Sequence, residues 1–143
     1  MTGNIILLQV EQQLTIRFSE VDSMGIVWHG HYLQYLEEAR EAFGRAYKLG
    51  YLDMYAHGFQ VPLIDLNIKY KQSIVYGDVI KVVIKFKYAA AAKIQFDYEI
   101  YKAQGNILVA TANTTQVFLS STGELQLIKP DFYKDWEREN GVA

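Results

Sequence analysis

Hydrophobic and polar residues alternate along much of this sequence, which is the period of a strand with one buried face. The alternation first appears at residues 14–18 and then stops until Gly58. Beyond Gly58 it returns in four longer runs, at residues 64–70, 80–88, 94–100 and 107–119. Turn-forming clusters occupy residues 104–106 and 121–123. The pattern predicts one short strand near the N-terminus and about four long antiparallel strands in the second half.

A different period fills residues 32–48. Here the apolar side chains recur every three or four positions and gather on one helical face, at Tyr35, Leu36, Ala39, Phe43, Ala46 and Tyr47. We expect Gly50 to end this helix in the left-handed conformation. Pro130 followed by Asp131 predicts a short C-terminal helix.

One long helix with a single apolar face can be covered by one curled antiparallel sheet. We therefore expect an α+β fold in which the sheet wraps the helix. The 143 residues suit one compact domain, so residues 1–143 are expected to form a single unit. Residues 89–92 are four alanines at a hairpin position, and they carry no turn signature.

The composition narrows the class of protein. Fourteen basic and 16 acidic residues give a net charge of −2, which disfavours nucleic acid as a partner. The absence of cysteine excludes thiol nucleophiles, disulfides and thiolate metal sites. The apolar run at residues 4–10 is too short for a membrane span and lacks the basic residues of a signal peptide. We expect a cytoplasmic protein.

Candidate chemistry is concentrated in residues 17–32, between the first strand and the helix. This segment holds two of the three histidines, two carboxylates, two glycines and a tryptophan. The first turn of a helix presents unpaired N–H groups, which suit an anion or a developing oxyanion, and here that turn lies at His29 to His31. Asp22 precedes His29 by seven residues, and Gly25 between them allows the chain to fold back.

A carboxylate beside oxyanion donors is sufficient for thioester hydrolysis. A thiol resembling free cysteine has a pKa of about 8.5, so the thiolate leaves without a general acid. Each residue also has another interpretation. For Asp22, capping a turn is about as well supported as a catalytic role. For His29 and His31, metal binding is a weaker alternative, because no third ligand is evident. We expect His57 to be solvated. Glu37 and Arg40 are either a surface pair or a buried contact.

The segment carries a recognisable motif, formed by Arg17-Phe18, Asp22, Gly25, Val27-Trp28-His29, Tyr32, Glu37 and Arg40. It resembles the motif of the hotdog-fold acyl-CoA thioesterases, in the hydroxybenzoyl-CoA thioesterase-like family and its Tol–Pal-associated branch. Pro62, the strand to Tyr70 and the Tyr76-Gly77-Asp78 turn fit the second half of that family. The resemblance spans about residues 10 to 130.

The resemblance implies an enzyme that needs no cofactor or metal and hydrolyses an acyl-CoA or acyl-carrier thioester. In it, Asp22 is the nucleophile or general base, and the backbone N–H of His29 polarises the thioester carbonyl. Gly25, Val27, Trp28 and Tyr32 are the implied substrate-binding neighbours. It also implies a homodimer with its sheets joined edge to edge, in some members paired again into a tetramer, with the active site at the dimer interface.

The sequence departs from this family at the central hairpin. Related members often carry basic residues there for the nucleotide phosphates, whereas this chain has alanines at residues 89–92. The substitute candidates for phosphate binding are Lys69, Lys71, Lys87 and Lys93. A non-catalytic hotdog acyl-binding or assembly module is the main competing function, and a hotdog dehydratase fits the motif less well. The sequence does not specify the acyl group.

Overall fold

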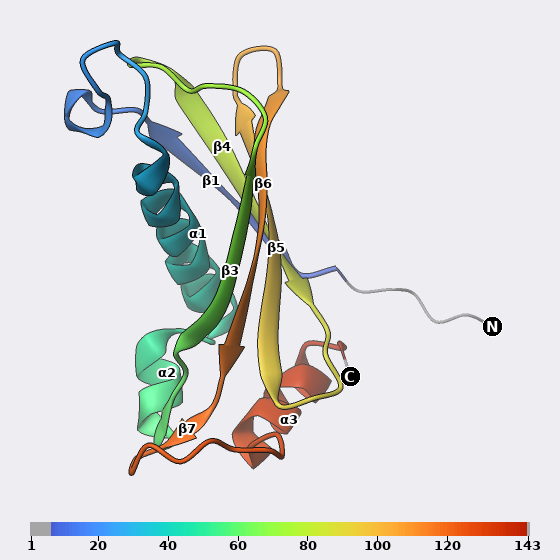
Figure 1. The fold of residues 1–143 in the computed structure, drawn as a ribbon. Helices are drawn as coiled ribbons and strands as arrows, with labels where there is room; N and C mark the ends of the chain where they lie inside the picture. The colour runs from blue at the N-terminus through green and yellow to red at the C-terminus, as the bar shows by residue number, and fades with distance from the viewer. Residues whose placement is uncertain (1–6, 143) are drawn as a thin grey trace.

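The computed structural model describes residues 7–142, which form one long helix against a curled antiparallel sheet (Figure 1). The strands are β1 (Gln9–Thr15), β2 (Phe59–Gln60), β3 (Leu63–Tyr70), β4 (Val79–Lys87), β5 (Lys93–Lys102), β6 (Ile107–Val117) and β7 (Leu119–Ser120). The α-helices are α1 (Tyr32–Tyr47), α2 (Tyr51–Ala56) and α3 (Asp131–Glu139), and two 3₁₀ turns, η1 (Phe18–Glu20) and η2 (His29–His31), precede α1.

The main sheet has the strand order β1-β4-β5-β6-β3, and all its neighbours are antiparallel. Its register places Ile84, Tyr98, Ala112 and Ile68 side by side across four strands. Side chains in such a row share one face of a sheet, and this is the face that α1 contacts. β1 and β3 are the two edges of this sheet, and β2 and β7 form a separate two-stranded pair.

The core lies between α1 and the inner face of the sheet. Phe43 of α1 is 1% exposed, and its ring meets the edge of Phe96 on β5 at 4.9 Å between centroids. Burial of a phenylalanine of this kind contributes about 1.5–3 kcal/mol. α1 packs mainly over β1 and β4, so the helix lies toward one side of the sheet and away from β3.

α3 closes the end of the core away from η1 and η2 (Figure 1). The indole N–H of Trp136 donates to the carbonyl oxygen of Tyr47 at 2.7 Å, which joins α3 to the last turn of α1. Lys129 pairs with Glu137, whose side chains are only 9% and 2% exposed. A buried charge of this kind needs a partner, so the pair ties α3 to the connection that precedes it.

The expected α+β architecture is confirmed, and so are the long helix, the C-terminal helix and the strands at β4, β5 and β6. The first strand is predicted too far along the chain, at residues 14–18, whereas β1 spans Gln9–Thr15. β1 ends at Thr15, and the chain then turns because the Glu20 carboxylate accepts the Arg17 N–H at 2.7 Å. Phe18 therefore opens η1 with its ring 78% exposed, although the alternation places it in a strand.

The predicted end of the long helix is also wrong. Lys48, and not Gly50, takes the left-handed conformation, with φ of 56°. Gly50 is extended, with φ of −84°, and precedes α2, which the sequence did not reveal. The backbone of Gly50 lies close to that of Gly44: a Cβ on Gly44 would be 2.7 Å from the Cα of Gly50. The chain has to turn tightly back over α1 before Gly50, which is why the left-handed residue is Lys48.

β3 differs from a strand with one buried and one wet face. A register shift between Leu63 and Asp65 takes Ile64 out of the alternation. Leu66 and Tyr70 lie on the inner face, yet they are 37% and 50% exposed because α1 packs mainly over β1 and β4 and meets Tyr70 at its first residue, Tyr32. Ile68 alone of this row is half-buried.

Two smaller points complete the comparison with the sequence. β4 ends at Lys87, so Tyr88 lies outside the strand and is half exposed. The start of the apolar run at residues 4–10 falls outside the described residues. Within residues 7–142, no helix is both long and apolar enough to cross a membrane.

The left-handed residue at the end of α1 yields a stability prediction. Lys48→Gly should raise the free energy of unfolding by about 0.5–1 kcal/mol, because glycine adopts positive φ without a Cβ clash. Urea denaturation measures this. Arg45→Gly, in the exposed face of the same helix, is the matched control and should lower stability by about 1 kcal/mol. Equal destabilisation by both changes would contradict the assignment of Lys48.

Candidate active site

The segment between β1 and α1 is held by backbone hydrogen bonds on both of its arms. The Val27 N–H donates to Ile74 at 2.8 Å, and the Trp28 N–H donates to Glu20 at 3.2 Å. Isolated bridges also pair Val21 with Val27 and Ile26 with Val75. These contacts fix the loop against the connection between β3 and β4, so the start of α1 has a defined position.

Asp22 sits at the tip of this loop and is exposed. Its Oδ1 accepts the N–H groups of Met24 at 2.8 Å and Ile26 at 3.2 Å. Gly25 permits the turn with φ of 75°, a conformation that favours glycine. The turn-cap interpretation of Asp22 is therefore confirmed for one oxygen. Oδ2 has no hydrogen-bond partner among the described residues, so the carboxylate is both oriented and available.

The start of α1 supplies N–H groups without acceptors. The His31 N–H donates to Trp28 at 2.9 Å, and the Tyr32 N–H donates to His29. The N–H groups of the two preceding residues, His29 and Gly30, find no acceptor within residues 7–142. Unpaired amides at a helix start favour a negatively charged or polarised oxygen.

Aromatic side chains surround these amides. The Trp28 ring lies between the two histidines of η2, with centroid distances of 5.4 Å to His29 and 5.6 Å to His31. Tyr70 of β3 contacts the edge of Tyr32 at 4.8 Å, and its hydroxyl donates to the His29 carbonyl oxygen at 3.1 Å. Burial raises the pKa of Tyr32, and the neighbouring Tyr70 adds to that rise.

Asp22 and the helix start line one pocket of about 460 Å³. Five predicted residues share it with Asp22: Val27, Trp28, His29, Tyr32 and Lys71. Sequence reasoning missed Tyr70, Gln72 and Ser73, which form the wall contributed by β3 and the residues after it. The alternation along β3 could have signalled Tyr70, since it places this residue on the helix side. Gly25 shapes the Asp22 turn without lining the pocket.

The other candidate lysines lie away from this pocket. Lys69 faces the outer side of the sheet, beside Lys85 and Asp97. Lys87 and Lys93 border the connection between β4 and β5, which is at the opposite end of the sheet from the Asp22 loop (Figure 1). That connection closes as the Lys93 N–H donates to Ala91 at 2.8 Å.

The histidines make contacts other than a metal cluster. The Nδ1 of His31 lies 3.1 Å from the Oε1 of Gln34. His57 is exposed, as expected, and its ring also stacks on Phe132 at 4.5 Å. Among residues 7–142, no group of three or more histidine, aspartate or glutamate side chains is placed to hold a metal ion.

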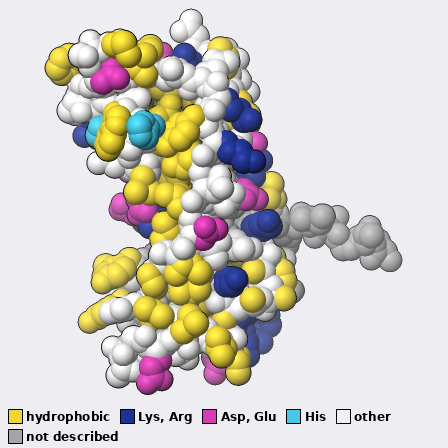
Figure 2. All heavy atoms as spheres, in the orientation of Figure 1, with side chains coloured by type: hydrophobic (Ala, Val, Ile, Leu, Met, Phe, Trp, Pro, Cys, Tyr) yellow, Lys and Arg dark blue, Asp and Glu magenta, His cyan; other side chains and the backbone are white. Residues whose placement is uncertain are grey.

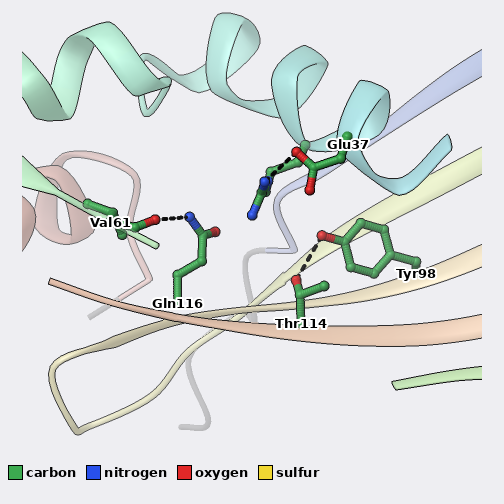
Figure 3. Close-up of polar contacts among 6 residues, drawn as sticks. Glu37, Val61, Tyr98, Thr114 and Gln116 are labelled. Atoms are coloured by element: carbon green, nitrogen blue, oxygen red, sulfur yellow. Dashed lines mark hydrogen bonds and ion pairs between the residues drawn. The ribbon is translucent and has the colours of Figure 1, made fainter. Parts of the chain in front are cut away.

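Glu37 and Arg40 combine both interpretations of this pair. Their side chains form an ion pair at 2.5 Å, with Glu37 48% exposed and Arg40 23% exposed. Figure 3 shows Glu37 on α1 above Tyr98, whose hydroxyl is 2.8 Å from that of Thr114. Burial raises the pKa of Tyr98 to about 12, against the lowering effects of the Thr114 hydrogen bond and the Arg40 charge. The pair thus borders the buried polar part of the inner sheet face.

Hydrophobic and histidine side chains meet at the surface around this site. Figure 2 shows histidines beside apolar groups near the upper left, with further apolar side chains below them toward α2. Phe18, Met24, Trp28 and Tyr76 are all more than half exposed at this end of the molecule. The site is therefore open on one side within a single chain.

Comparison with known proteins gives a consistent result. A family model described as the thioesterase-like superfamily matches residues 16–135. The chain is 30% identical over 131 residues to a Bacillus subtilis protein named "Putative acyl-CoA thioesterase YneP", covering 90% of this chain and 95% of that one.

Solved structures match the fold as well. A DHNA-CoA thioesterase from Staphylococcus aureus has a TM-score of 0.80 at 25% identity, covering 94% of this chain and 92% of that chain. A 4-hydroxybenzoyl-CoA thioesterase has a TM-score of 0.77 at 22% identity, covering 90% and 98%. The expected hotdog fold is confirmed.

The crowded start of α1 yields a prediction for the free protein. A Cβ on Gly30 would overlap the Trp28 ring, so Gly30→Ala should displace that ring while the Trp136 indole, bonded to Tyr47, stays in place. The indole N–H signals in an NMR spectrum report this: one should move and the other should not. Ser121→Ala, at an exposed position of a distant turn, is the control. An unmoved Trp28 signal would contradict the packing.

Proposed function

The chain belongs to the thioesterase-like superfamily, and we propose that it hydrolyses acyl-CoA thioesters at the pocket between Asp22 and the start of α1. One observation carries this proposal. Asp22, whose carboxylate has a free oxygen, and His29, whose N–H finds no acceptor among the described residues, line the same pocket, and the unpaired N–H of Gly30 follows directly along the chain. These are the two functions that thioester hydrolysis requires: a group that attacks or activates water, and donors for the oxyanion.

The proposed reaction uses only groups of the chain and water. Asp22 either attacks the thioester carbon or removes a proton from a water molecule that attacks it. The carbonyl oxygen gains negative charge and is stabilised by the N–H groups of His29 and Gly30. The carbon–sulfur bond then breaks and the electron pair leaves with the thiolate, whose low basicity makes a general acid unnecessary. The products are the free acid and the thiol.

We propose that the leaving thiol is coenzyme A. A relative of this chain is named as a putative acyl-CoA thioesterase, and Lys71 lies in the pocket. In this proposal, Lys71 contacts a phosphate or the pantetheine amide region outside the thioester. Lys69, Lys87 and Lys93 remain predicted contacts, since they lie elsewhere in one subunit. The assignment to the Tol–Pal-associated branch also stays a prediction, as does a cytoplasmic location, where CoA esters are available.

We further propose that the active form is a homodimer joined at β3. β3 is an edge strand with unpaired N–H and C=O groups, and its Ile64, Leu66 and Tyr70 are exposed. Natural proteins rarely leave an apolar edge open. β1, the other edge, exposes the polar Gln9, Glu11, Gln13 and Thr15 instead. Pairing β3 with its copy across a twofold axis would give hydrogen-bond partners to the β3 edges of both subunits. A further pairing of two such dimers would give a tetramer.

A non-catalytic acyl-binding module is the second candidate. The observation that favours it is the Asp22 turn, in which Oδ1 accepts two backbone N–H groups and so has a structural reason to be an aspartate. On this alternative the pocket holds an acyl group and releases it unchanged.

Asp22→Asn separates the two candidates. The amide oxygen of asparagine can accept the same two N–H groups, so the turn should persist while the nucleophile or base is lost. We expect hydrolysis to fall by about a hundredfold or more, measured by trapping the free thiol released from short-chain, long-chain and aromatic acyl-CoAs. His29→Ala should cost less, because the backbone N–H survives. A variant at position 22 with half the original rate would rule out the catalytic role.

Leu66→Glu tests the dimer. A charge on the exposed inner side of β3 should disfavour pairing of the two edges, so light scattering should show a monomer and the specific activity should fall. Leu127→Glu, on a connection where Leu127 is 84% exposed, introduces the same charge and should change neither. A monomer that retains the full rate would show that the site is complete within one chain.

A further inference from the structure

Among residues 7–142, Tyr70 makes one polar contact, and that contact is with the backbone of the proposed oxyanion site. Its hydroxyl donates to the carbonyl oxygen of His29 at 3.1 Å, across 41 positions of sequence. The same oxygen accepts the N–H of Tyr32. Both acceptor positions of this carbonyl are therefore occupied, one by the first bond of the helix and one by a side chain from the edge strand.

The His29 carbonyl belongs to the same peptide group as the Gly30 N–H. A peptide group is planar and trans, so its N–H points opposite to its C=O. A side chain that holds the carbonyl also sets the direction of that N–H. A hydrogen bond accepted by the carbonyl further polarises the group and strengthens its N–H as a donor, by about 10–30%.

Without the Tyr70 hydrogen bond, little else would restrict the orientation of the His29–Gly30 peptide group. Gly30 has no side chain, and residues 29–31 form a 3₁₀ turn, whose hydrogen-bond geometry is poorer than that of an α-helix. Tyr70 itself is held by edge-to-face contacts with Tyr32 at 4.8 Å and His29 at 6.1 Å. The hydroxyl therefore meets the turn from a supported ring, although Tyr70 is half exposed.

We propose that Tyr70 is a positioning residue, which aims and polarises the Gly30 N–H toward the thioester oxygen through the His29 carbonyl. The inference rests on the proposed function and adds a residue to it. Tyr70 has no reason to touch the nucleotide or to attack the substrate in this role. Its effect should appear in the transition state, where the oxyanion develops, and much less in substrate binding.

Tyr70→Phe tests this by removing only the hydroxyl and keeping the ring. We expect kcat to fall roughly tenfold with KM changed by less than about twofold, a smaller loss than the 10²–10³ seen when an oxyanion donor itself is removed. Tyr101→Phe is the matched control. Tyr101 pairs with Lys81 in register and shares its outer face of the sheet, so its hydroxyl should not affect either constant. Light scattering checks that both variants keep the assembly of the original protein.

A spectroscopic measurement separates polarisation from general loosening. Benzoyl-CoA labelled with ¹³C at the thioester carbonyl is bound to Asp22→Asn, which should hold it without rapid hydrolysis, and the carbonyl stretch is read by infrared difference spectroscopy. Adding Tyr70→Phe to this background should shift the stretch to higher frequency, because the carbonyl is less polarised. Adding Tyr101→Phe should leave it unchanged.

The outcomes distinguish a failure of the Tyr70 role from a failure of the proposed thioesterase function. If the original protein hydrolyses acyl-CoA but Tyr70→Phe alters neither kcat nor the carbonyl stretch, the positioning role is overturned and the proposed function stands. A fall in kcat with an unshifted stretch also overturns it, since the hydroxyl would then act in another way. If the original protein hydrolyses none of the acyl-CoAs in the panel, the proposed function fails and the role of Tyr70 fails with it.

Discussion

A single helix has to cover a sheet that is wider than itself, and most of the molecule follows from this mismatch. The 16 residues of α1 extend about 24 Å and pack mainly over β1 and β4. α3 covers one end of the remaining inner face through Tyr133 and Trp136. What stays open is the strip beside β3, where apolar side chains remain exposed. The pocket with Asp22 lies at one end of this strip, so the same incomplete coverage creates both the site and the candidate surface for a second subunit.

The position of α1 also decides what its first turn can do. A helix start buried in the core would need capping side chains for its amides, but η2 has no side-chain cap. The loop from Val21 to Trp28 is instead bonded to the strand connection at Ile74 and Val75. The backbone therefore fixes the turn and leaves its amides available. A capping side chain at this position would have stabilised the helix and closed the site.

The sequence predicts the parts of the fold whose patterns are set by burial on one face. β4, β5 and α1 follow their periodicity because each packs that face against the core. The pattern fails where local contacts compete: Glu20 turns the chain before Phe18 can join β1, and the close approach of Gly44 and Gly50 moves the left-handed residue to Lys48. Asp22 and His29 were predictable from their motif. The alternation along β3 places Tyr70 on the helix side, but it does not predict the bond to His29, which depends on how β3 passes the helix start.

The openness of the site links the chemistry to assembly. Asp22, Trp28 and His29 are exposed in one chain, and water weakens electrostatic interactions: two unit charges 4 Å apart interact by about 1 kcal/mol in bulk water and about 4 kcal/mol near a protein surface. An oxyanion held by two amides gains in the same way when water is excluded. A second chain on β3 would cover the wall formed by Tyr70 to Ser73, and so would strengthen the donors without moving them. In the proposed dimer, the edge strand would therefore contribute to catalysis by excluding solvent as well as by holding the turn.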